Sequence, residues 1–354
     1  MSICPTIKSL QPYQGGKPIS ELQRELGLNR VVKLASNENP LPTSVKVRAA
    51  IERAVSEVGR YPDGNGFELK QAISQHLSVS MDAITLGNGS NDLLELIARA
   101  YVCGTGDEVI FSQYAFVVYP LVTQALGAKA VVTPAKEFGH DLAAMLAAIT
   151  DNTKLIFIAN PNNPTGTLLS DEAVYAFLLQ VPNHITVVLD QAYIEYLDAE
   201  DNAVSWLKKF NNLVITRTFS KAYGLAGLRV GYSICSAEIA DYINRIRQPF
   251  NVNHIAQSAA IAVLSDKEFI AKSVSENKKG LLQLAKGFGE LGLIYIPSAA
   301  NFIAVKVSDA GVIYQKLLEK GVIVRPVEMP NYIRVSVGTQ NENTTLLDAL
   351  KSLL

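Results

Sequence analysis

Short apolar runs alternate with helix-like segments through the middle of this chain, and this alternation restricts its fold more than any other feature. The apolar runs include Ile84-Thr85-Leu86, Val109-Ile110-Phe111 and Leu155-Ile156-Phe157-Ile158. Between them, as in residues 93–101, apolar side chains recur at helical spacing. Strands that alternate with helices form a parallel sheet covered by helices. The sequence therefore predicts an α/β fold with a mostly parallel sheet.

The order of predicted elements changes toward the carboxyl terminus, where it reads strand, strand, helix, strand, strand, helix over residues 294–354. This order predicts a smaller α+β domain. We therefore expect an amino-terminal arm that joins the small domain (1–40), a large domain (41–245) and the small domain itself (246–354). Within the arm, residues 1–18 are expected to be extended, and Ser20 with Gln23 predicts a capping box for a helix that ends near Gly27.

Charge and composition exclude several classes of protein. The 32 basic and 33 acidic residues give a net charge of −1, so no broad basic field is available for nucleic acid or an acidic membrane surface. No apolar stretch approaches the length that spans a bilayer. Cys4, Cys103 and Cys235 are too widely spaced for a disulfide framework or a zinc site, which favours a reducing cytoplasm. The four histidines are isolated in sequence, and no metal site is expected.

One loop carries the residues expected to do chemistry. The apolar run Leu213-Val214-Ile215 is followed by Thr218, Ser220 and Lys221, and then by Arg229. A partly desolvated lysine attacks carbonyls as a neutral amine and forms a Schiff base, while hydroxyls and an arginine hold phosphate. A phosphorylated aldehyde fits both groups, and pyridoxal 5′-phosphate is such a cofactor. Taken alone, a Ser-Lys pair is more typical of a surface lysine in a turn, and only its position after a strand and the following Gly-Leu-Arg give a binding site equal weight.

Other polar residues follow predicted strands at the same edge of the sheet. Asp190 comes directly after the apolar residues 185–189, with Tyr193 three residues later. Asn163 follows the strand at 155–158, and the glycine turn 87–91, which includes Ser90 and Asn91, precedes a helix. Free N–H groups at a helix amino terminus bind anions, and a buried carboxylate requires a partner such as a pyridine nitrogen. Asp190 as a helix cap and residues 87–91 as a simple turn remain open alternatives.

Further candidates lie in loops. Tyr114 follows the strand at 109–111 and is placed to stand over a ligand at the sheet edge, and Tyr61 lies in a turn from which it could reach a partner's site. Arg325 and Arg334 flank the last predicted strand pair and could bind an acidic substrate group. The polar loop 33–40, which contains Asn39, could line a site. For each of these residues, an ordinary surface or turn position is the alternative.

Asn163-Pro164-Thr165-Gly166, Asp190 with Tyr193, Ser220-Lys221 and Arg229 together resemble the fold-type I aminotransferases of classes I and II. Within that group the chain is similar to the histidinol-phosphate aminotransferases in a set of further segments that spans nearly its whole length: 13–18, 33–40, 61–64, 87–90, 112–116, 190–196 and 333–338.

The resemblance implies roles for particular residues in a pyridoxal 5′-phosphate enzyme. Lys221 would bind the cofactor covalently and act in catalysis with Asp190 and Tyr193, and Asp190 would pair with the pyridine nitrogen. The resemblance also implies the remaining contacts: Asn163 and Tyr193 on the ring oxygen, Tyr114 stacked on the ring, Ser90, Asn91, Thr218, Ser220 and Arg229 on the phosphate, Tyr61 arriving from the second subunit of a homodimer, and Arg334, Arg325, Tyr13 and Asn39 on the substrate.

The reaction that the resemblance implies is a reversible ping-pong transfer of an amino group. L-Glutamate would donate the group and imidazole acetol phosphate would accept it, giving 2-oxoglutarate and L-histidinol phosphate in histidine biosynthesis. An aromatic aminotransferase and a decarboxylase of a phosphorylated amino acid on the same fold are the alternatives. A regulator that binds the cofactor without catalysis would need a DNA-binding module, and residues 1–40 are too short and insufficiently basic for one.

Overall fold

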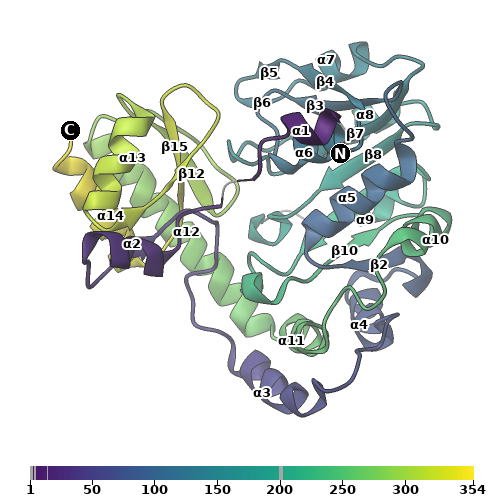
Figure 1. The fold of residues 1–354 in the computed structure, drawn as a ribbon, viewed down its shortest axis with the longest axis horizontal. Helices are drawn as coiled ribbons and strands as arrows, with labels where there is room; N and C mark the ends of the chain where they lie inside the picture. The colour runs from purple at the N-terminus through teal and green to yellow at the C-terminus, as the bar shows by residue number, and fades with distance from the viewer. Residues whose placement is uncertain (1–2, 4, 14, 199–201) are drawn as a thin grey trace.

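The computed structural model describes residues 3, 5–13, 15–198 and 202–354, which form two lobes (Figure 1). Cys4 and Gln14, which the sequence analysis includes, lie outside the described residues. The large lobe consists of a seven-stranded sheet and its helices. The small lobe consists of a four-stranded sheet with helices α2 (Ile19–Leu26), α13 (Ala310–Glu319) and α14 (Gln340–Lys351).

The large sheet confirms the predicted mostly parallel α/β architecture. Its strands, in spatial order, are β2 (Ile84–Gly87), β10 (Gly231–Ile234), β9 (Leu213–Thr218), β8 (Thr186–Asp190), β7 (Thr153–Ala159), β3 (Glu108–Ser112) and β4 (Lys129–Thr133). Strand β10 is antiparallel to both of its neighbours, whereas the pairs from β9 to β4 are parallel. The carboxyl ends of β7, β8 and β9 therefore meet at one edge of the sheet.

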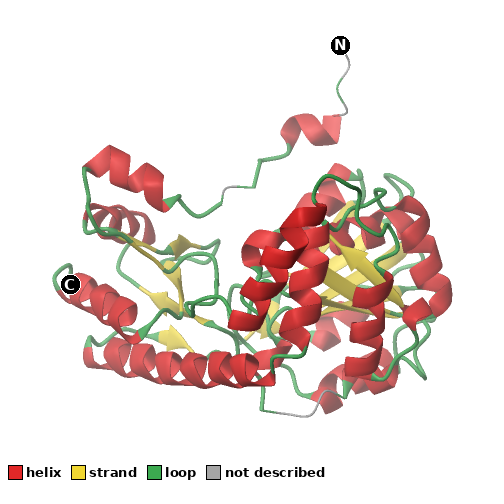
Figure 2. Ribbon diagram, turned by 90° about the horizontal axis from the view of Figure 1, so that it is seen from below, coloured by secondary structure: helices red, strands yellow, loops and turns green. Residues whose placement is uncertain are grey.

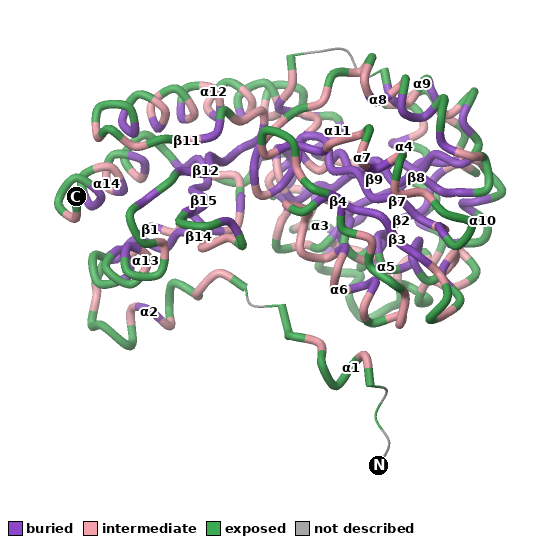
Figure 3. Tube along the Cα trace, turned by 90° about the horizontal axis from the view of Figure 1, so that it is seen from above, coloured by how far each residue is buried: buried purple, intermediate pink, exposed green. Residues whose placement is uncertain are grey.

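Both faces of this sheet are covered. In β7, Leu155 and Phe157 face one apolar cluster, and Ile156 and Ile158 face another, as the two-residue period of a strand requires. This double burial explains why the parallel strands read as continuous apolar runs in the sequence. Buried residues are concentrated in the strands (Figure 3). The helices of the large lobe are α3 (Val45–Ala54), α4 (Phe67–Leu77), α5 (Ser90–Tyr101), α6 (Val118–Ala125), α7 (Leu142–Ala147), α8 (Asp171–Leu178), α9 (Ala203–Trp206), α10 (Ala237–Ile246) and α11 (His254–Leu264).

The small lobe has the predicted succession of strands and helices. Its antiparallel sheet has the order β11 (Tyr295–Ile296), β12 (Phe302–Lys306), β15 (Tyr332–Ser336) and β14 (Arg325–Pro326). The amino-terminal segment joins this lobe, because β1 (Val32–Lys33) pairs in parallel with β13 (Val322–Ile323). Leu22 of α2 packs in the same cluster as Leu318 and Ile323.

The 24-residue helix α12 (Lys267–Glu290) runs from the large lobe to the small lobe (Figures 1 and 2). Helix α11, just before it, packs against α3 and α4, and its Ala256 and Ala260 share an apolar cluster with Val47 and Leu69. The boundary between residues 245 and 246 remains a proposal for where the two domains divide.

The amino-terminal arm differs from the expectation in two respects. A short helix, α1 (Pro5–Ser9), lies against α6, and Gln124 Nε2 donates a hydrogen bond to the carbonyl of Thr6 at 3.2 Å. The predicted capping box is wrong, because α2 begins at Ile19, before Ser20, and Pro18 occupies the N-cap position without a side-chain bond. The predicted end of this helix is confirmed at Gly27, which has φ 66.

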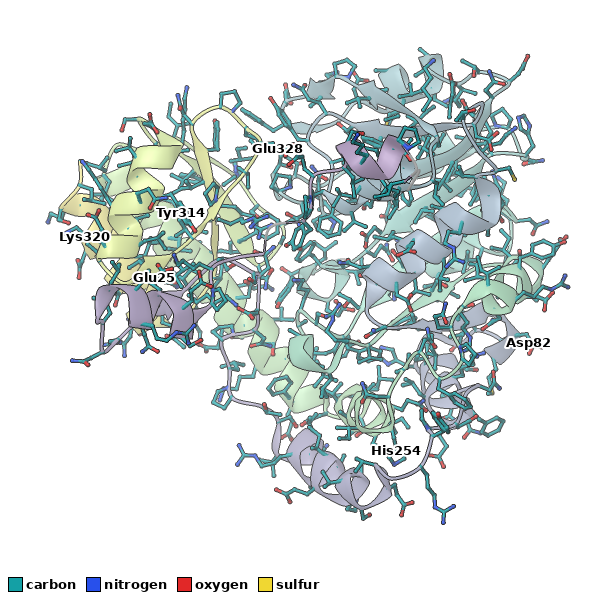
Figure 4. The ribbon with its side chains drawn as sticks, in the orientation of Figure 1. Glu25, Asp82, His254, Tyr314, Lys320 and Glu328 are labelled. Atoms are coloured by element: carbon teal, nitrogen blue, oxygen red, sulfur yellow. The ribbon has the colours of Figure 1, made fainter. Side chains whose placement is uncertain are left out.

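A tight hairpin of the large lobe reaches the small lobe. Strands β5 (Ala135–Lys136) and β6 (Gly139–His140) are joined by Glu137 and Phe138, which have φ 50 and φ 65. The ring of Phe138 lies 5.6 Å from that of Tyr332 in β15, and it packs on the cluster that contains Met329. Glu328, beside Met329, lies on the side of the small lobe that faces the large lobe (Figure 4).

The remaining elements are four short 3₁₀ helices: η1 (Val55–Glu57), η2 (Met81–Ala83), η3 (Ile194–Tyr196) and η4 (Ala226–Leu228). In the part of the chain that the structure describes, no helix combines the length and apolarity needed to cross a bilayer.

The hairpin turn generates a prediction about stability. Left-handed backbone disfavours residues with a Cβ, so Glu137→Gly should raise the free energy of unfolding by roughly 0.5–1 kcal/mol, measured from urea denaturation. Phe138→Gly relieves the same strain but removes the ring contacts with Tyr114 and Tyr332, so it should lower stability. Equal effects of the two substitutions would show that the Phe138 contacts contribute nothing.

Candidate active site

A cavity of about 240 Å³ opens at the carboxyl edge of the large sheet, between the two lobes. It is lined by Tyr13, Ser36, Asn37, Glu38, Ser90, Asn91, Phe116, Ala159, Pro161, Asn163, Asp190, Ala192, Tyr193, Thr218, Ser220, Lys221, Ala226, Arg229 and Arg334. Because β7, β8 and β9 end here, most of the polar residues that were predicted to follow strands are brought together. Open α/β sheets bind ligands at this edge.

Lys221 lies in the loop after β9, and its side chain forms part of the cavity lining. Its Nζ donates a hydrogen bond to the carbonyl of Ser36 at 3.1 Å and lies 5.9 Å from the centre of the Tyr193 ring. Burial, and after it the positive charge of Arg334, lower the pKa of Lys221 to about 7. A substantial fraction of this amine is therefore neutral and nucleophilic near neutral pH.

Asp190 is the last residue of β8 and is only 4% exposed. Its Oδ2 accepts a hydrogen bond from Tyr119 Oη at 2.9 Å, and its Oδ1 is buried without a hydrogen-bond partner in the described part of the chain. Burial raises the pKa of Asp190 to about 6, and the bond from Tyr119 opposes that rise. A buried carboxylate oxygen without a partner is costly, so Oδ1 suits a ligand atom that carries a proton.

Tyr193 lies at the centre of a polar network that joins both lobes. Its hydroxyl accepts hydrogen bonds from Nδ2 of Asn163 at 3.1 Å and from Nδ2 of Asn37 at 3.0 Å. Arg334 Nη1 donates to Asn163 Oδ1 at 2.6 Å, and its Nη2 donates to the carbonyl of Ala35 at 2.7 Å. Burial raises the pKa of Tyr193 to about 12, so the phenol stays protonated.

An anion site lies beside Lys221. Arg229 Nη1 donates to Ser220 Oγ at 3.3 Å, and the backbone N–H of Ser220 donates to Thr218 Oγ1 at 3.1 Å. Gly89, in the turn before α5, has φ 81, a backbone conformation that favours glycine, and a Cβ there would lie 2.3 Å from Arg229 Nη2. The free N–H groups at the start of α5, the arginine and the hydroxyls together can hold a phosphate group.

Four predicted site residues do not line the cavity. The Tyr114 ring lies against Phe138 with the ring centres 6.1 Å apart, and Phe116 lines the cavity in its place. The chain passes the sheet edge at Tyr114 and reaches the cavity two residues later, just before α6. Tyr61 is 82% exposed and stacks on Phe250 at 4.6 Å.

The other two belong to the predicted substrate set. The Arg325 guanidinium lies over the ring of Tyr13, 5.4 Å from its centre, and Tyr13 itself lines the cavity. Asn39 Nδ2 donates to the carbonyl of Ala222 and to Ser273 Oγ, at 2.9 and 2.8 Å. Asn39 therefore braces the loop that carries Lys221.

The sequence analysis missed three residues of the site. Tyr119 and Phe116 come from α6 and the turn before it, and Asn37 lies in the polar loop that was expected to line a site. Only the loop gave a signal. Among the described residues, no group of three or more histidine, cysteine, aspartate or glutamate side chains is arranged to hold a metal ion.

Comparisons with known proteins agree with this geometry. Residues 29–350 match the family described as aminotransferase class I and II. The chain is 54% identical to a histidinol-phosphate aminotransferase of Methylobacillus flagellatus, over 98% of this chain and 96% of that protein. It is 55% identical to histidinol-phosphate aminotransferase 1 of Idiomarina loihiensis, over 99% of this chain and 96% of that protein.

A solved structure shares the whole architecture. The crystal structure of histidinol-phosphate aminotransferase from Sinorhizobium meliloti in complex with pyridoxal-5'-phosphate is similar with a TM-score of 0.90 and 30% sequence identity. The similarity covers 99% of this chain and 98% of that chain.

The low pKa of Lys221 generates a prediction for the protein without ligand. Reductive methylation with formaldehyde requires a neutral amine, so the labelled fraction of Lys221 should rise with pH and reach half its maximum near pH 7 rather than 10.5. Arg334→Met should move that midpoint upward, because it removes a positive charge that lowers the pKa. Arg325→Met, outside the cavity lining, should leave the midpoint unchanged. Peptide mass spectrometry measures the labelling, and a midpoint above pH 9 would contradict the assignment.

Proposed function

Because the chain belongs to the aminotransferase class I and II family, we propose that it transfers the amino group of L-glutamate to imidazole acetol phosphate. The products are 2-oxoglutarate and L-histidinol phosphate, and the reaction belongs to histidine biosynthesis. Its relatives at 54% and 55% identity, matched over nearly their whole lengths, are named for this activity. The structural observation that carries the proposal is one cavity that is lined by Lys221, by Asp190 with its unpartnered oxygen and by the anion site at Arg229.

The residues of the cavity fit pyridoxal 5′-phosphate. Oδ1 of Asp190 lacks a partner and would accept the proton of the pyridine nitrogen. Arg229, Ser220, Thr218 and the start of α5 would hold the phosphate. Tyr193 and Asn163 would bind the ring oxygen, and an aromatic side chain of residues 112–116, Phe116 or the predicted Tyr114, would lie against the ring.

When bound, the cofactor supplies a protonated pyridine ring that takes up the electron pair released from the substrate Cα. Asp190 keeps the ring nitrogen protonated, because an ionised carboxylate favours a positive partner. Lys221 Nζ removes the proton from the substrate Cα and returns it, and its pKa of about 7 matches that exchange. The closed, half-buried position of this amine limits its contact with water.

We assign the acidic ends of the substrates to Arg334, with help from Tyr13 and Arg325. Arg334 is buried beside Phe302, and its Nε has no hydrogen-bond partner in the described residues, so one donor remains available for an anion. The glutamate α-carboxylate and the phosphate of histidinol phosphate would use this cation in successive half reactions. Arg325 adds a second positive charge beside Tyr13, which lines the cavity.

We also propose that the protein acts as a homodimer in the cytoplasm. Tyr61 and Phe250 form an exposed aromatic pair, Val58 and Phe67, close to Tyr61 in sequence, are also exposed, and a second copy would cover these side chains. Tyr61 would then reach the partner's cofactor. Cys103 and Cys235 are free thiols, which suit a reducing compartment.

The acceptor preference tests the proposed function. In a glutamate-coupled assay, imidazole acetol phosphate should be used with a higher kcat/KM than phenylpyruvate. The reverse preference would favour an aromatic aminotransferase. Release of carbon dioxide from a phosphorylated amino acid would favour a decarboxylase.

The role of Lys221 is tested by trapping. Borohydride reduction in the presence of cofactor should leave a pyridoxyl group on Lys221, and Lys221→Ala should lower activity by at least about a hundredfold. Lys70 is the matched control, because it is also buried but bonds Asn65 outside the cavity. Lys70→Ala should keep the adduct. A pyridoxyl group found only on other lysines would contradict the proposal.

Tyr119 is expected to support cofactor binding through Asp190. Tyr119→Phe keeps the ring stacked on Phe157 but removes the donor, so the pKa of Asp190 should rise beyond about 6. More of Asp190 is then protonated at pH 6, and the cofactor dissociation constant should rise about tenfold there and less at pH 8. Fluorescence titration of the apoprotein measures it. Tyr175→Phe, which removes a hydroxyl bonded to Lys209 instead, is the control and should show no change.

A further inference from the structure

The hydroxyl of Tyr193 has both of its acceptor positions occupied. A phenol oxygen accepts two hydrogen bonds and donates one. Asn37 Nδ2 and Asn163 Nδ2 lie 3.0 and 3.1 Å from this oxygen. If both amides donate, the hydroxyl hydrogen of Tyr193 must point elsewhere, and the cavity that Tyr193 lines is the remaining direction. The orientation of the two amides therefore decides where this hydrogen goes.

The orientation of the Asn37 amide follows from a donor that cannot be reversed. The backbone N–H of Asn37 donates to Ser336 Oγ at 2.7 Å. Ser336 must still place its own hydrogen, and among the described residues the acceptor it has is Asn37 Oδ1, 2.9 Å away. With Oδ1 accepting from Ser336, only the Nδ2 group is left to face Tyr193.

The Asn163 amide is oriented in the same way from the other side. A guanidinium can only donate, and Arg334 Nη1 lies 2.6 Å from Asn163 Oδ1. The Nδ2 of Asn163 therefore faces Tyr193. Two obligate donors, a backbone N–H and a guanidinium, thus set the direction of one hydroxyl hydrogen.

We propose that Asn37, held by Ser336, is a positioning residue that directs the Tyr193 hydroxyl hydrogen toward the ring oxygen of the cofactor. This inference rests on the proposed function and concerns the same cavity. Asn37 acts through Tyr193 and needs no contact of its own with the reacting atoms.

The backbone at Asn37 is built for this role. Asn37 is 1% exposed and has φ 54, a left-handed conformation that is unfavourable for residues with a Cβ and that asparagine tolerates better than most. Asn301 Nδ2 holds the Asn37 carbonyl at 2.9 Å. Strain of this kind persists where surrounding contacts require it. The small lobe supplies Ser336 from β15, so the hydroxyl is oriented only when the two lobes are together.

The bound cofactor reports the direction of this hydrogen. A hydrogen bond donated to the ring oxygen partly neutralises the negative charge of that oxygen. The oxygen then attracts the proton on the cofactor-bound nitrogen of Lys221 less strongly, and the pKa of that nitrogen falls. Loss of that donor should therefore raise the pH midpoint of the cofactor's visible absorbance. The other charged or titratable groups near Tyr193 in the described residues are Lys221, Asp190, Arg334, Tyr13, Tyr119 and Tyr196, and all six are unchanged in the test below.

The test compares two substitutions of Asn37. Asn37→Asp keeps the shape but replaces the donor with an acceptor, so Tyr193 should turn its hydrogen toward residue 37. The midpoint should rise by about one pH unit, close to the rise in Tyr193→Phe. Asn37→Gly suits the left-handed backbone and leaves the hydroxyl free to face the cavity, so its shift should be smaller. A role in packing alone predicts the opposite order, because glycine removes more contacts than aspartate.

Two controls separate orientation from charge and from stability. Ser336→Ala adds no charge but frees the Asn37 amide to turn, so the midpoint should rise in the same direction. Asn343→Asp changes another buried asparagine, which bonds Gly338 and Gln283 outside the cavity, and it should leave the midpoint unchanged.

The result that overturns the inference is a midpoint that moves as much in Asn37→Gly as in Asn37→Asp, or that stays unchanged in Ser336→Ala. Borohydride trapping on the wild-type protein separates this failure from a failure of the proposed function. A pyridoxyl group on Lys221 with unshifted midpoints overturns the inference alone. No pyridoxyl group on Lys221 overturns both.

Discussion

Burial of the Asp190 carboxylate at the end of β8 is the constraint on which the rest of the site depends. The strand is covered on both faces, so this charge is removed from water and its burial carries a large free-energy cost. Tyr119 offsets the cost at one oxygen, and the second oxygen is left for a positively charged ring nitrogen. Burial also destabilises the charged form of Lys221. One ligand can therefore satisfy both groups, by bonding covalently to the amine and by donating a hydrogen bond to the carboxylate.

The small lobe takes part in the site through one strand. Tyr332, Arg334 and Ser336 alternate along β15 and therefore lie on one face. Tyr332 contacts the Phe138 hairpin, Arg334 bonds Asn163, and Ser336 bonds Asn37. When this strand approaches the large lobe, it positions both the Arg334 guanidinium and the hydrogen-bond network of Tyr193. The two-residue spacing of side chains in β15 thus links the aromatic contact of Tyr332 to the polar contacts of Arg334 and Ser336.

Several site residues could be predicted because each follows a strand of a parallel sheet. Asp190, Asn163 and Lys221 come after apolar runs, and the carboxyl ends of parallel strands share an edge. Tyr114 also follows a strand, but the chain brings Phe116 into the cavity instead. Which of these two residues enters the cavity depends on how the turn packs. Tyr114 packs against Phe138, which belongs to another hairpin. No local pattern contains that contact.

The sequence by itself determined the alternation of strands and helices, the separate α+β lobe and the chemical identity of the lysine, aspartate and phosphate-binding loops, because periodicity and residue type are local properties. It did not determine the antiparallel direction of β10, the helix α1 or the pairing of Tyr119 with Asp190. The direction of the Tyr193 hydroxyl was decided by tertiary structure alone. It depends on donors from residues 37, 163, 334 and 336, which only folding brings within hydrogen-bond distance.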